Sequence, residues 1–321
     1  MKYIKLTIRV LNCICIFICF TMCKAYSQQF TIPIFPDTQK EVDAKFDMFY
    51  SQIQWIVANK DSLDIPIVLH VGDIVENNTF DNWETASHGF EILDRYHINY
   101  ALADGNHDND THIKDKTILH NKQSDHINLR KTEKFNIYFP FYRFNAQRGR
   151  YEENKSDNAY YTFKAGGLDW LVLTLEYCAR QGPVDWANNI IANHPNFNVI
   201  ILTHYFLNTD GTIGKTNGSI GDLSEQSIYD QLVKKHANIL MVLSGHLTGS
   251  AWRVDRGEKG NKIYEILQDY QGDDYGGGYL RLLKINTAEN TISARMYSPY
   301  YKQSKVDSSQ FNFKNVSFIQ P

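Results

Sequence analysis

Cysteine is almost absent from this sequence beyond its first residues. Only Cys178 lies after residue 27, and the other four of the five cysteines are Cys13, Cys15, Cys19 and Cys23. A chain segment with one cysteine cannot form an internal disulfide, even in an oxidising compartment. The shortage of thiolates also disfavours a structural zinc site.

A long hydrophobic run is missing as well. The apolar run Leu11 to Met22 is shorter than the roughly 20 residues that a transmembrane helix needs. Basic residues precede this run and small residues follow it, as in a cleaved export signal: Lys2, Lys5, Arg9, Ala25 and Ser27. We therefore predict a signal peptide over residues 1–27, export to the periplasm or the extracellular space, and no transmembrane segment after cleavage. Met22 and Lys24 flank Cys23 in a way that disfavours a lipid anchor there.

Positive charge is also in short supply. The formal net charge is −3, and it becomes −7 without residues 1–27, because that segment holds four basic residues and no acidic ones. A mildly acidic chain argues against a nucleic-acid footprint. The sequence shows no internal repeat and no low-complexity linker, so we expect residues 28–321 to form a single domain.

The stretch that organises the rest is Ile67 to Asn77, IVLHVGDIVEN. Its apolar start predicts a buried parallel strand. Gly72 then permits a tight turn, which places Asp73 at the carboxyl edge of a sheet. One alternative is that Asp73 merely caps the helix that follows. Because one carboxylate can bridge two cations, we instead predict that Asp73 bridges a two-metal centre.

Asp37 is expected at the same sheet edge. It follows a predicted first strand, Phe30 to Pro36, and apolar residues then recur at steps of four and three from Val42 to Ile56, as on one face of a helix. A strand–helix–strand order implies parallel pairing with a right-handed crossover. The carboxyl ends of both strands, and hence Asp37 and Asp73, should therefore lie together.

Three further predicted strands end in polar side chains. The residues that follow them are Asn106 with His107, then His204, then His246. Carboxylate oxygens, imidazole nitrogens and an amide oxygen suit Mn, Fe, Zn or Ni rather than calcium. The sequence thus predicts a metal site at one edge of an α/β fold.

Residues 109–157 are the hardest part to interpret. They are rich in Lys, Asn, His and Asp, and they carry an aromatic patch from Phe135 to Phe144. We predict a surface insertion whose aromatic side chains pack over the cleft. Histidines without ligand-like spacing are expected to be solvated: His112, His120 and His126. His70, in an apolar strand, is expected to be a hydrogen-bonded core residue rather than a ligand.

The sequence resembles the calcineurin-like metallophosphoesterases over nearly the whole mature chain. The family's blocks, Asp-x-His, Gly-Asp, Gly-Asn-His-Asp/Glu, a lone His and Gly-His-x-His, stand here in order as Asp37-Thr38-Gln39, Gly72-Asp73, Gly105-Asn106-His107-Asp108, His204 and Gly245-His246-Leu247-Thr248. The PDTQ opening, the segment around Glu176, the DYQGDDYGGGYLRLL stretch and the closing MYSPY also resemble a secreted bacterial branch. The resemblance implies a four-layer α/β/β/α sandwich of two mixed sheets flanked by helices, whereas the pattern of elements alone predicts only α/β.

The resemblance also implies two divalent metal ions. The second ion would be held by Asp73, Asn106, His204 and His246, and the first by Asp37, Asp73 and Gln39. Two departures affect the first ion, because Gln39 and Thr248 stand where the family has histidines. We expect a weakened first site that binds its ion less tightly, or with more water, and that prefers a harder cation such as Mn or Mg.

By the same resemblance, the activity would be hydrolysis of a small phosphate ester, mono- or diester, by a hydroxide that bridges two metals. His107 would face the substrate and protonate the leaving group, a contribution worth roughly 10²–10⁴ in rate. Asp108 would hold the His107 ring in its cationic form, or would only stabilise a turn.

Two other classes of function remain open from the sequence. The loss of two first-site histidines fits a single-metal or non-catalytic ligand-binding protein on the same scaffold. The aromatic-rich insertion fits a cell-surface interaction module. Counting bound metal ions separates the enzyme from the binding protein.

Overall fold

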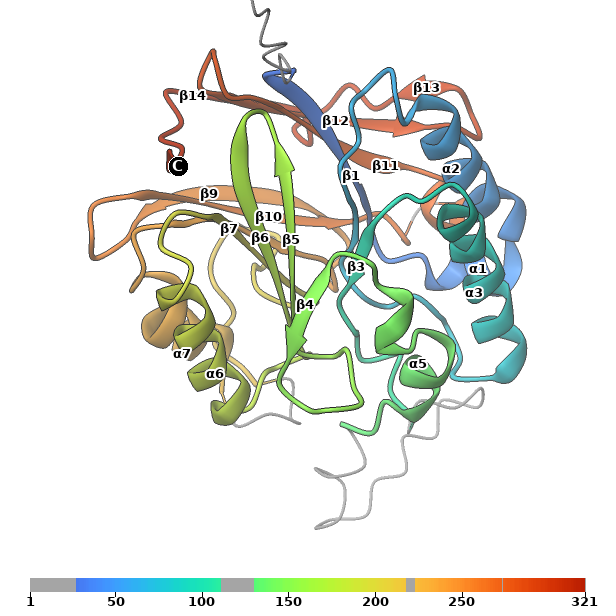
Figure 1. The fold of residues 1–321 in the computed structure, drawn as a ribbon. Helices are drawn as coiled ribbons and strands as arrows, with labels where there is room; N and C mark the ends of the chain where they lie inside the picture. The colour runs from blue at the N-terminus through green and yellow to red at the C-terminus, as the bar shows by residue number, and fades with distance from the viewer. Residues whose placement is uncertain (1–26, 111–129, 218–222, 273, 321) are drawn as a thin grey trace, which may run out of the picture.

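The computed structural model describes residues 27–110, 130–217, 223–272 and 274–320. In these ranges the chain forms four layers, with two seven-stranded mixed sheets face to face and helices on the outer side of each (Figure 1). The predicted α/β/β/α sandwich is therefore confirmed. The predicted signal peptide, apart from Ser27, and the histidines of the insertion, His112, His120 and His126, lie outside the described residues.

The first sheet joins the two ends of the chain. Its strands are β1 (Gln29–Phe35), β2 (Val68–His70), β3 (Tyr100–Leu102), β11 (Leu280–Asn286), β12 (Thr291–Ser298), β13 (Gln303–Ser304) and β14 (Phe311–Lys314). Their order is β13-β12-β11-β1-β2-β3, and β14 pairs with β12. Because β1, β2 and β3 are parallel, their carboxyl ends share one edge.

The second sheet is built from the middle of the chain. Its strands are β4 (Gln147–Arg150), β5 (Ala159–Ala165), β6 (Leu168–Leu175), β7 (Asn198–Thr203), β8 (Ile239–Ser244), β9 (Gly249–Arg256) and β10 (Lys262–Asp269). They are arranged in the order β4-β5-β6-β7-β8-β10-β9. The neighbours β6, β7, β8 and β10 are parallel, so their carboxyl ends also share an edge.

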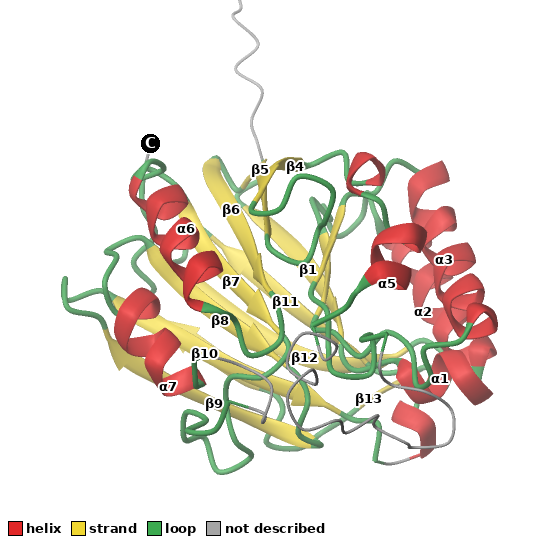
Figure 2. Ribbon diagram, turned by 90° about the horizontal axis from the view of Figure 1, so that it is seen from below, coloured by secondary structure: helices red, strands yellow, loops and turns green. Residues whose placement is uncertain are grey.

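Two groups of helices cover the sheets (Figure 2). The helices α1 (Gln39–Ala44), α2 (Phe46–Asn59) and α3 (Phe80–Arg95) lie beside the first sheet, and α6 (Gln181–Ala192) and α7 (Glu225–Ile228) beside the second. The single helix expected from Val42 to Ile56 is divided at Lys45, whose φ of −142° is not helical. Within the described ranges, none of the helices is long and apolar enough to cross a membrane.

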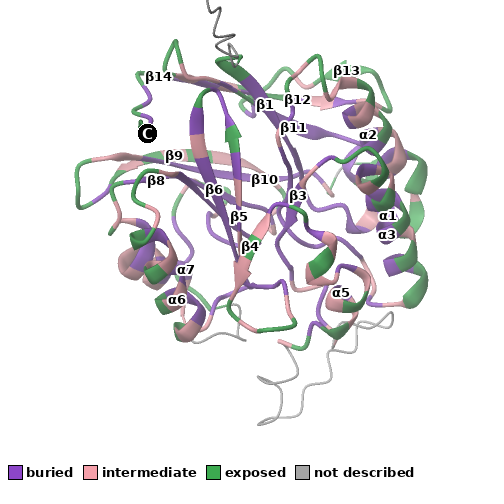
Figure 3. Cartoon of the chain, in the orientation of Figure 1, coloured by how far each residue is buried: buried purple, intermediate pink, exposed green. Residues whose placement is uncertain are grey.

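The hydrophobic core lies between the sheets and under the helices. Figure 3 shows buried residues along most strands and exposed ones on the outward faces of the helices. The prediction for His70 is confirmed, since this side chain is fully buried. Its Nε2 lies 2.8 Å from Thr38 Oγ1, and the Gly72 amide donates to its Nδ1. Burial and the nearby His204 lower the pKa of His70 to about 3, so the ring is neutral.

Three phenylalanines of the insertion belong to this core. Phe135, on the short helix α5 (Glu133–Tyr138), and Phe139 are fully buried, and Phe144 is nearly so. The Phe139 ring lies 5.3 Å from Phe90, and the rings of Phe135 and Trp83 lie 6.1 Å apart. The expectation that these aromatics pack over the cleft is therefore wrong. They pack beneath α3, because large rings without polar partners gain more from full burial.

Candidate metal centre

The carboxyl ends of strands from both sheets meet at one place. Asp37, Asp73 and Asn106 follow β1, β2 and β3 of the first sheet, while His204 and His246 follow β7 and β8 of the second. The His246 amide donates to Asp37 Oδ2 at 3.0 Å, and His204 Nε2 lies 3.3 Å from Asp73 Oδ1. The five predicted strand-end residues are thus brought together, and the two sheets contribute different members.

Four atoms that could bind a metal ion converge on one point of this group. His204 Nε2 lies 3.1 Å from Asn106 Oδ1 and 3.2 Å from His246 Nδ1, besides its contact with Asp73. The other ring nitrogen of His204, Nδ1, donates to the Val71 carbonyl at 3.0 Å, because a carbonyl can only accept. A neutral His204 therefore presents a lone pair at Nε2, facing two oxygens that also only accept. Such a set of acceptors fits a cation, and ligand atoms of Asp73, His204 and His246 lie within 4.8 Å of one another.

A second set of oxygens lies on the other side of Asp73. Asp37 and Gln39 are buried, and within the described residues Asp37 Oδ1 and Gln39 Oε1 have no hydrogen-bond partner. Gln39 Nε2 donates to Asp73 Oδ2 at 3.1 Å, whereas Asp73 Oδ1 faces His204. The two oxygens of Asp73 are thus directed to two different sides. Two unpaired buried oxygens fit a second cation position, because an unpaired buried acceptor is costly.

The backbone at the strand ends is unusual and makes this geometry possible. Gly72 has φ +99°, and the next residue, Asp73, has φ +52°. A Cβ on Gly105 would lie 2.2 Å from Asp73 Oδ1 and 2.4 Å from the Asp73 amide nitrogen. Glycine at this position therefore allows the third strand end to approach Asp73 closely. Strained backbone of this kind is typical of functional sites.

The pKa values of Asp73 and His204 are shifted in opposite directions. Burial opposes ionisation of Asp73, but His204 and His107 outweigh it and hold the pKa of this carboxyl well below its usual range. Burial lowers the pKa of His204, but the charge and hydrogen bond of Asp73 have a larger effect and raise it above its usual value. Asp73 is therefore an anion at neutral pH and the natural centre of a cation site.

His107 lies at the edge of this group and is partly open to solvent. Its amide donates to Asp73 Oδ1 at 2.9 Å, its Nδ1 lies 2.8 Å from the Glu76 carbonyl, and its Nε2 lies 4.0 Å from Asp73 Oδ2. Burial lowers the pKa of His107, but Asp73 and Glu76 together raise it above the usual value. A partly exposed, readily protonated imidazole beside a cation site can donate a proton.

The carboxylate of Asp108 is bound by backbone amides, and its charge raises the pKa of His107. Its Oδ1 accepts from the amides of Ile74 and Val75, at 2.9 and 3.1 Å, and its Oδ2 accepts from the Gly105 amide at 2.8 Å. The carboxylate joins the turns after β2 and β3, which favours the turn alternative. Glu76, through its backbone carbonyl, instead orients the His107 ring.

Thr248, which stands where the family has a histidine, contacts a residue outside the predicted set. Its Oγ1 donates to Asp269 Oδ2 at 3.1 Å. Asp269 is fully buried at the end of β10 and was not among the predicted site residues. The alternating residues from Lys262 to Gln268 predict a strand, and Asp269 follows it just as Asp37 and Asp73 follow theirs.

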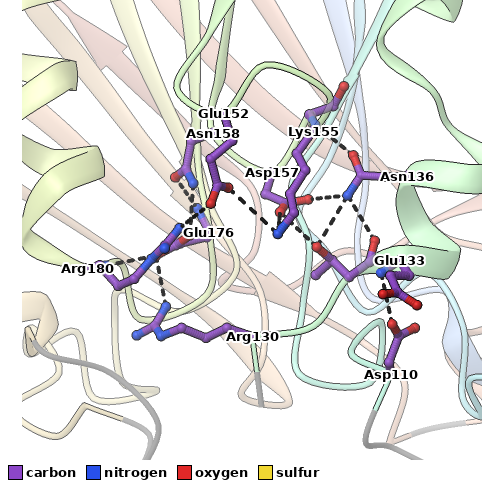
Figure 4. A network of polar contacts seen from close by, with 12 residues as sticks. Asp110, Arg130, Glu133, Asn136, Glu152, Lys155, Asp157, Asn158, Glu176 and Arg180 are labelled. Atoms are coloured by element: carbon purple, nitrogen blue, oxygen red, sulfur yellow. Dashed lines mark hydrogen bonds and ion pairs between the residues drawn. The ribbon is translucent and has the colours of Figure 1, made fainter. Parts of the chain in front are cut away.

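The ring of Tyr177 lies beside His204 and His246, and a polar network around Glu176 fixes the preceding residue. Glu176, directly after β6, accepts hydrogen bonds from Arg130 Nη1 and from Arg180 Nε and Nη2, at 2.7 to 2.9 Å (Figure 4). Burial alone would raise the pKa of Glu176, but the two arginines lower it. The next residue, Tyr177, has its ring 5.5 Å from that of His204 and 5.4 Å from that of His246.

Comparison with known proteins agrees with this geometry. The model of the calcineurin-like phosphoesterase family matches residues 30–248, more than half of the chain. The chain belongs to the calcineurin-like phosphoesterase family.

Relatives agree with the assignment in sequence and in fold. The chain is 29% identical over 277 residues to the uncharacterized protein YvnB of Bacillus subtilis (strain 168), over 83% of this chain and 20% of YvnB. It therefore spans about a fifth of the length of this curated relative. The purple acid phosphatase PPD1 from yellow lupin (Lupinus luteus) seeds has a similar fold, with a TM-score of 0.56 and 15% identity over 90% of this chain and 54% of that one. At this identity the likeness concerns the fold.

Proposed function

We propose that this chain hydrolyses a small phosphate ester in a reaction that depends on two divalent cations. The observation that carries the proposal is the convergence of Asp73 Oδ1, Asn106 Oδ1, His204 Nε2 and His246 Nδ1, with neighbouring contacts of 3.1 to 3.3 Å. Family membership supports a phosphoesterase rather than another metal-dependent activity.

The residues present fit such a centre. Asp73, Asn106, His204 and His246 would hold one cation, and Asp37, Gln39 and Asp73 the other, with Asp73 shared. When bound, the pair of cations would neutralise the phosphoryl oxygens and supply the bridging hydroxide that attacks phosphorus. Mn, Fe, Zn and Ni all suit the nitrogen-containing position.

His107 supplies the proton in this proposal. Its partly exposed ring can reach a substrate that lies over the centre, and the Glu76 carbonyl, which accepts from Nδ1, leaves Nε2 to act on the leaving oxygen. The nearby Asp73 raises the pKa of His107, which favours the cationic ring that can donate a proton. Asp108 supports this step by fixing the turn that bears His107, and its charge also raises the pKa of His107.

The setting proposed for the chain follows from its sequence. We propose that residues 1–27 direct export, that residues 28–321 form one domain of a secreted bacterial branch with a PDTQ opening, and that the partner is a small phosphoester rather than a nucleic acid. The acidic balance after residue 27 supports the last point.

A ligand-binding protein with one metal remains the second candidate. It is favoured by one observation, that Gln39 and Thr248 replace imidazole donors by an amide and a hydroxyl. Such a protein would contain one ion per chain or none, and it would retain a phosphoester without cleaving it. Elemental analysis of the purified full chain distinguishes the two candidates.

The direct test of the enzyme is hydrolysis of p-nitrophenyl phosphate and bis-p-nitrophenyl phosphate by the full chain with added Mn²⁺. We expect turnover of at least one ester, and its loss in Asp73→Asn, because the shared carboxylate is removed. Asp185→Asn, on the exposed face of α6, is the matched control and should retain activity. A metal-loaded wild type that cleaves neither ester would contradict the proposal.

A further inference from the structure

Asp269 lies at the same sheet edge as the candidate ligands. It ends β10, which runs parallel to β8, and Leu267 of β10 pairs with Ser244 of β8. Asp269 and His246 each come two residues after this pair, so they lie level with each other at the carboxyl edge. The side chain of Asp269 is fully buried. A sixth strand end therefore brings a carboxylate to the site.

The surroundings of Thr248 explain why this carboxylate is there. Thr248 Oγ1 donates to Asp269 Oδ2 at 3.1 Å, and Gln271 donates through its amide to Oδ1 at 2.8 Å and through Nε2 to Oδ2 at 3.0 Å. A Cβ on Gly272 would lie 2.6 Å from Thr248 Cγ2, so the loop after β10 packs directly on Thr248. This loop fills the space that a histidine at position 248 would need, and it orients Asp269.

Buried oxygens without partners lie beside these groups. Asp37 Oδ2 accepts from the amide of His246, the residue that lies level with Asp269 at the sheet edge. Asp37 Oδ1 and Gln39 Oε1, both buried, have no hydrogen-bond partner in the described residues. A cation among these oxygens would satisfy both unpaired atoms.

We propose that Asp269 is the anionic partner of the first cation, in place of the two histidines that Gln39 and Thr248 replace. This inference rests on the proposed function and concerns the same centre. The first position then has oxygen donors alone, from Asp37, Gln39 and Asp73, and Asp269 adds a buried negative charge beside them. Oxygen donors select hard cations, so this position takes Mn²⁺ or Mg²⁺ rather than Zn²⁺. The second position keeps two imidazoles, and the centre holds two different kinds of ion when both are supplied.

The test is the number and affinity of bound ions, measured by calorimetric titration of the metal-free full chain with Mn²⁺ and by elemental analysis. We expect two ions in the wild type. In Asp269→Asn, one ion should remain and the other should bind about tenfold more weakly or worse, as when a supporting carboxylate is removed from a metal site. Titration of the wild type with an equal mixture of Zn²⁺ and Mn²⁺ should give one of each per chain.

Two variants make this result specific. Asp274→Asn removes the same charge from an exposed residue of the same loop and should bind both ions as the wild type does. Thr248→Val keeps the size of the side chain but removes its hydrogen bond to Asp269, and should weaken only the ion that Asp269→Asn affects. Thr248→Val also gives a result if Asp269→Asn does not fold.

The outcomes separate this inference from the proposed function. A wild type that binds no ion overturns both. A wild type with two ions whose affinities do not change in Asp269→Asn or Thr248→Val overturns the role of Asp269 alone, and ester hydrolysis by that wild type would leave the proposed function standing. A wild type with a single ion also overturns the inference, because the first position would then be empty.

Discussion

At the scale of single residues, the centre is defined by acceptors that face one another. Asp73 Oδ1 and Asn106 Oδ1 lie 3.3 and 3.1 Å from His204 Nε2. The Val71 carbonyl accepts from the other ring nitrogen, so a neutral His204 presents a lone pair to both oxygens. A water molecule at this place would satisfy the group poorly, because it would have to donate a hydrogen bond to every one of these acceptors at once. The arrangement is explained by a positive charge at its middle.

His107 gives a prediction at this scale. Replacing it in His107→Gln should lower kcat by roughly 10²–10⁴, because a general acid is lost. The metal content should stay at the wild-type value, since the ring is directed to Glu76 and to the substrate side. Steady-state kinetics with elemental analysis measures both, and His88→Gln on the exposed face of α3 is the control. A kcat within threefold of the wild type would remove His107 from the mechanism.

Strand ends could be read from the sequence residue by residue, but hydrogen-bond partners could not. A polar residue after an apolar run is visible in the chain, which is why Asp37 could be selected, and a preceding glycine marks Asp73 and Asn106 further. Asp269 ends its strand without a glycine, and it opens a loop rich in Asp and Gly that has the composition of a turn. For Asp108 the motif suggested a partner that the hydrogen bonds do not show. Its position in the family motif suggested a contact with His107, whereas three backbone amides donate to its carboxylate oxygens.

At the scale of elements, periodicity predicted most strands and helices, and burial decided the rest. β9 was not predicted, because it is an edge strand with several part-exposed residues and an exposed Trp252, so its apolar side chains do not form a run. The helix after β1 is broken at Lys45, which its pattern of apolar residues does not reveal. The aromatic insertion could not be placed, because a run of rings is equally compatible with a cleft wall and with the core.

The insertion provides the prediction at this scale. Phe139→Ala should lower the free energy of unfolding by about 3–5 kcal/mol, because it empties a fully buried ring site against Phe90 and Trp83. The KM of the variant, measured well below its unfolding temperature, should equal that of the wild type. Tyr142→Ala, three residues on and 77% exposed, is the control and should change stability little. A raised KM with unchanged stability would return the aromatics to the cleft.

At the scale of the whole molecule, stability should depend on pH through Glu225. This side chain is fully buried, and burial raises the pKa of its carboxyl to about 8, with only partial offset from its hydrogen bonds. The folded state therefore keeps a proton that the unfolded state loses above about pH 4.3. Stability should fall as the pH rises from there to about 8, by at most about 1.4 kcal/mol per unit, and should level off above that.

Glu225→Gln tests this dependence. The variant cannot ionise, so its unfolding free energy should fall less between pH 5 and pH 8 than that of the wild type, as measured by denaturant titration at each pH. Glu289→Gln, in an exposed turn, should keep the wild-type slope. Equal slopes for Glu225→Gln and the wild type would show that Glu225 is ionised in the folded protein.

The pairing of β1 with β11 bears on when the protein matures. Thr31 is matched with Lys284, so β1 waits for a partner strand that is synthesised much later. Asp37 and its neighbours gain their final framework only after β11 has emerged. In the proposed centre, cations are consequently captured late, and the ions available where folding finishes, rather than those at the ribosome, decide its content.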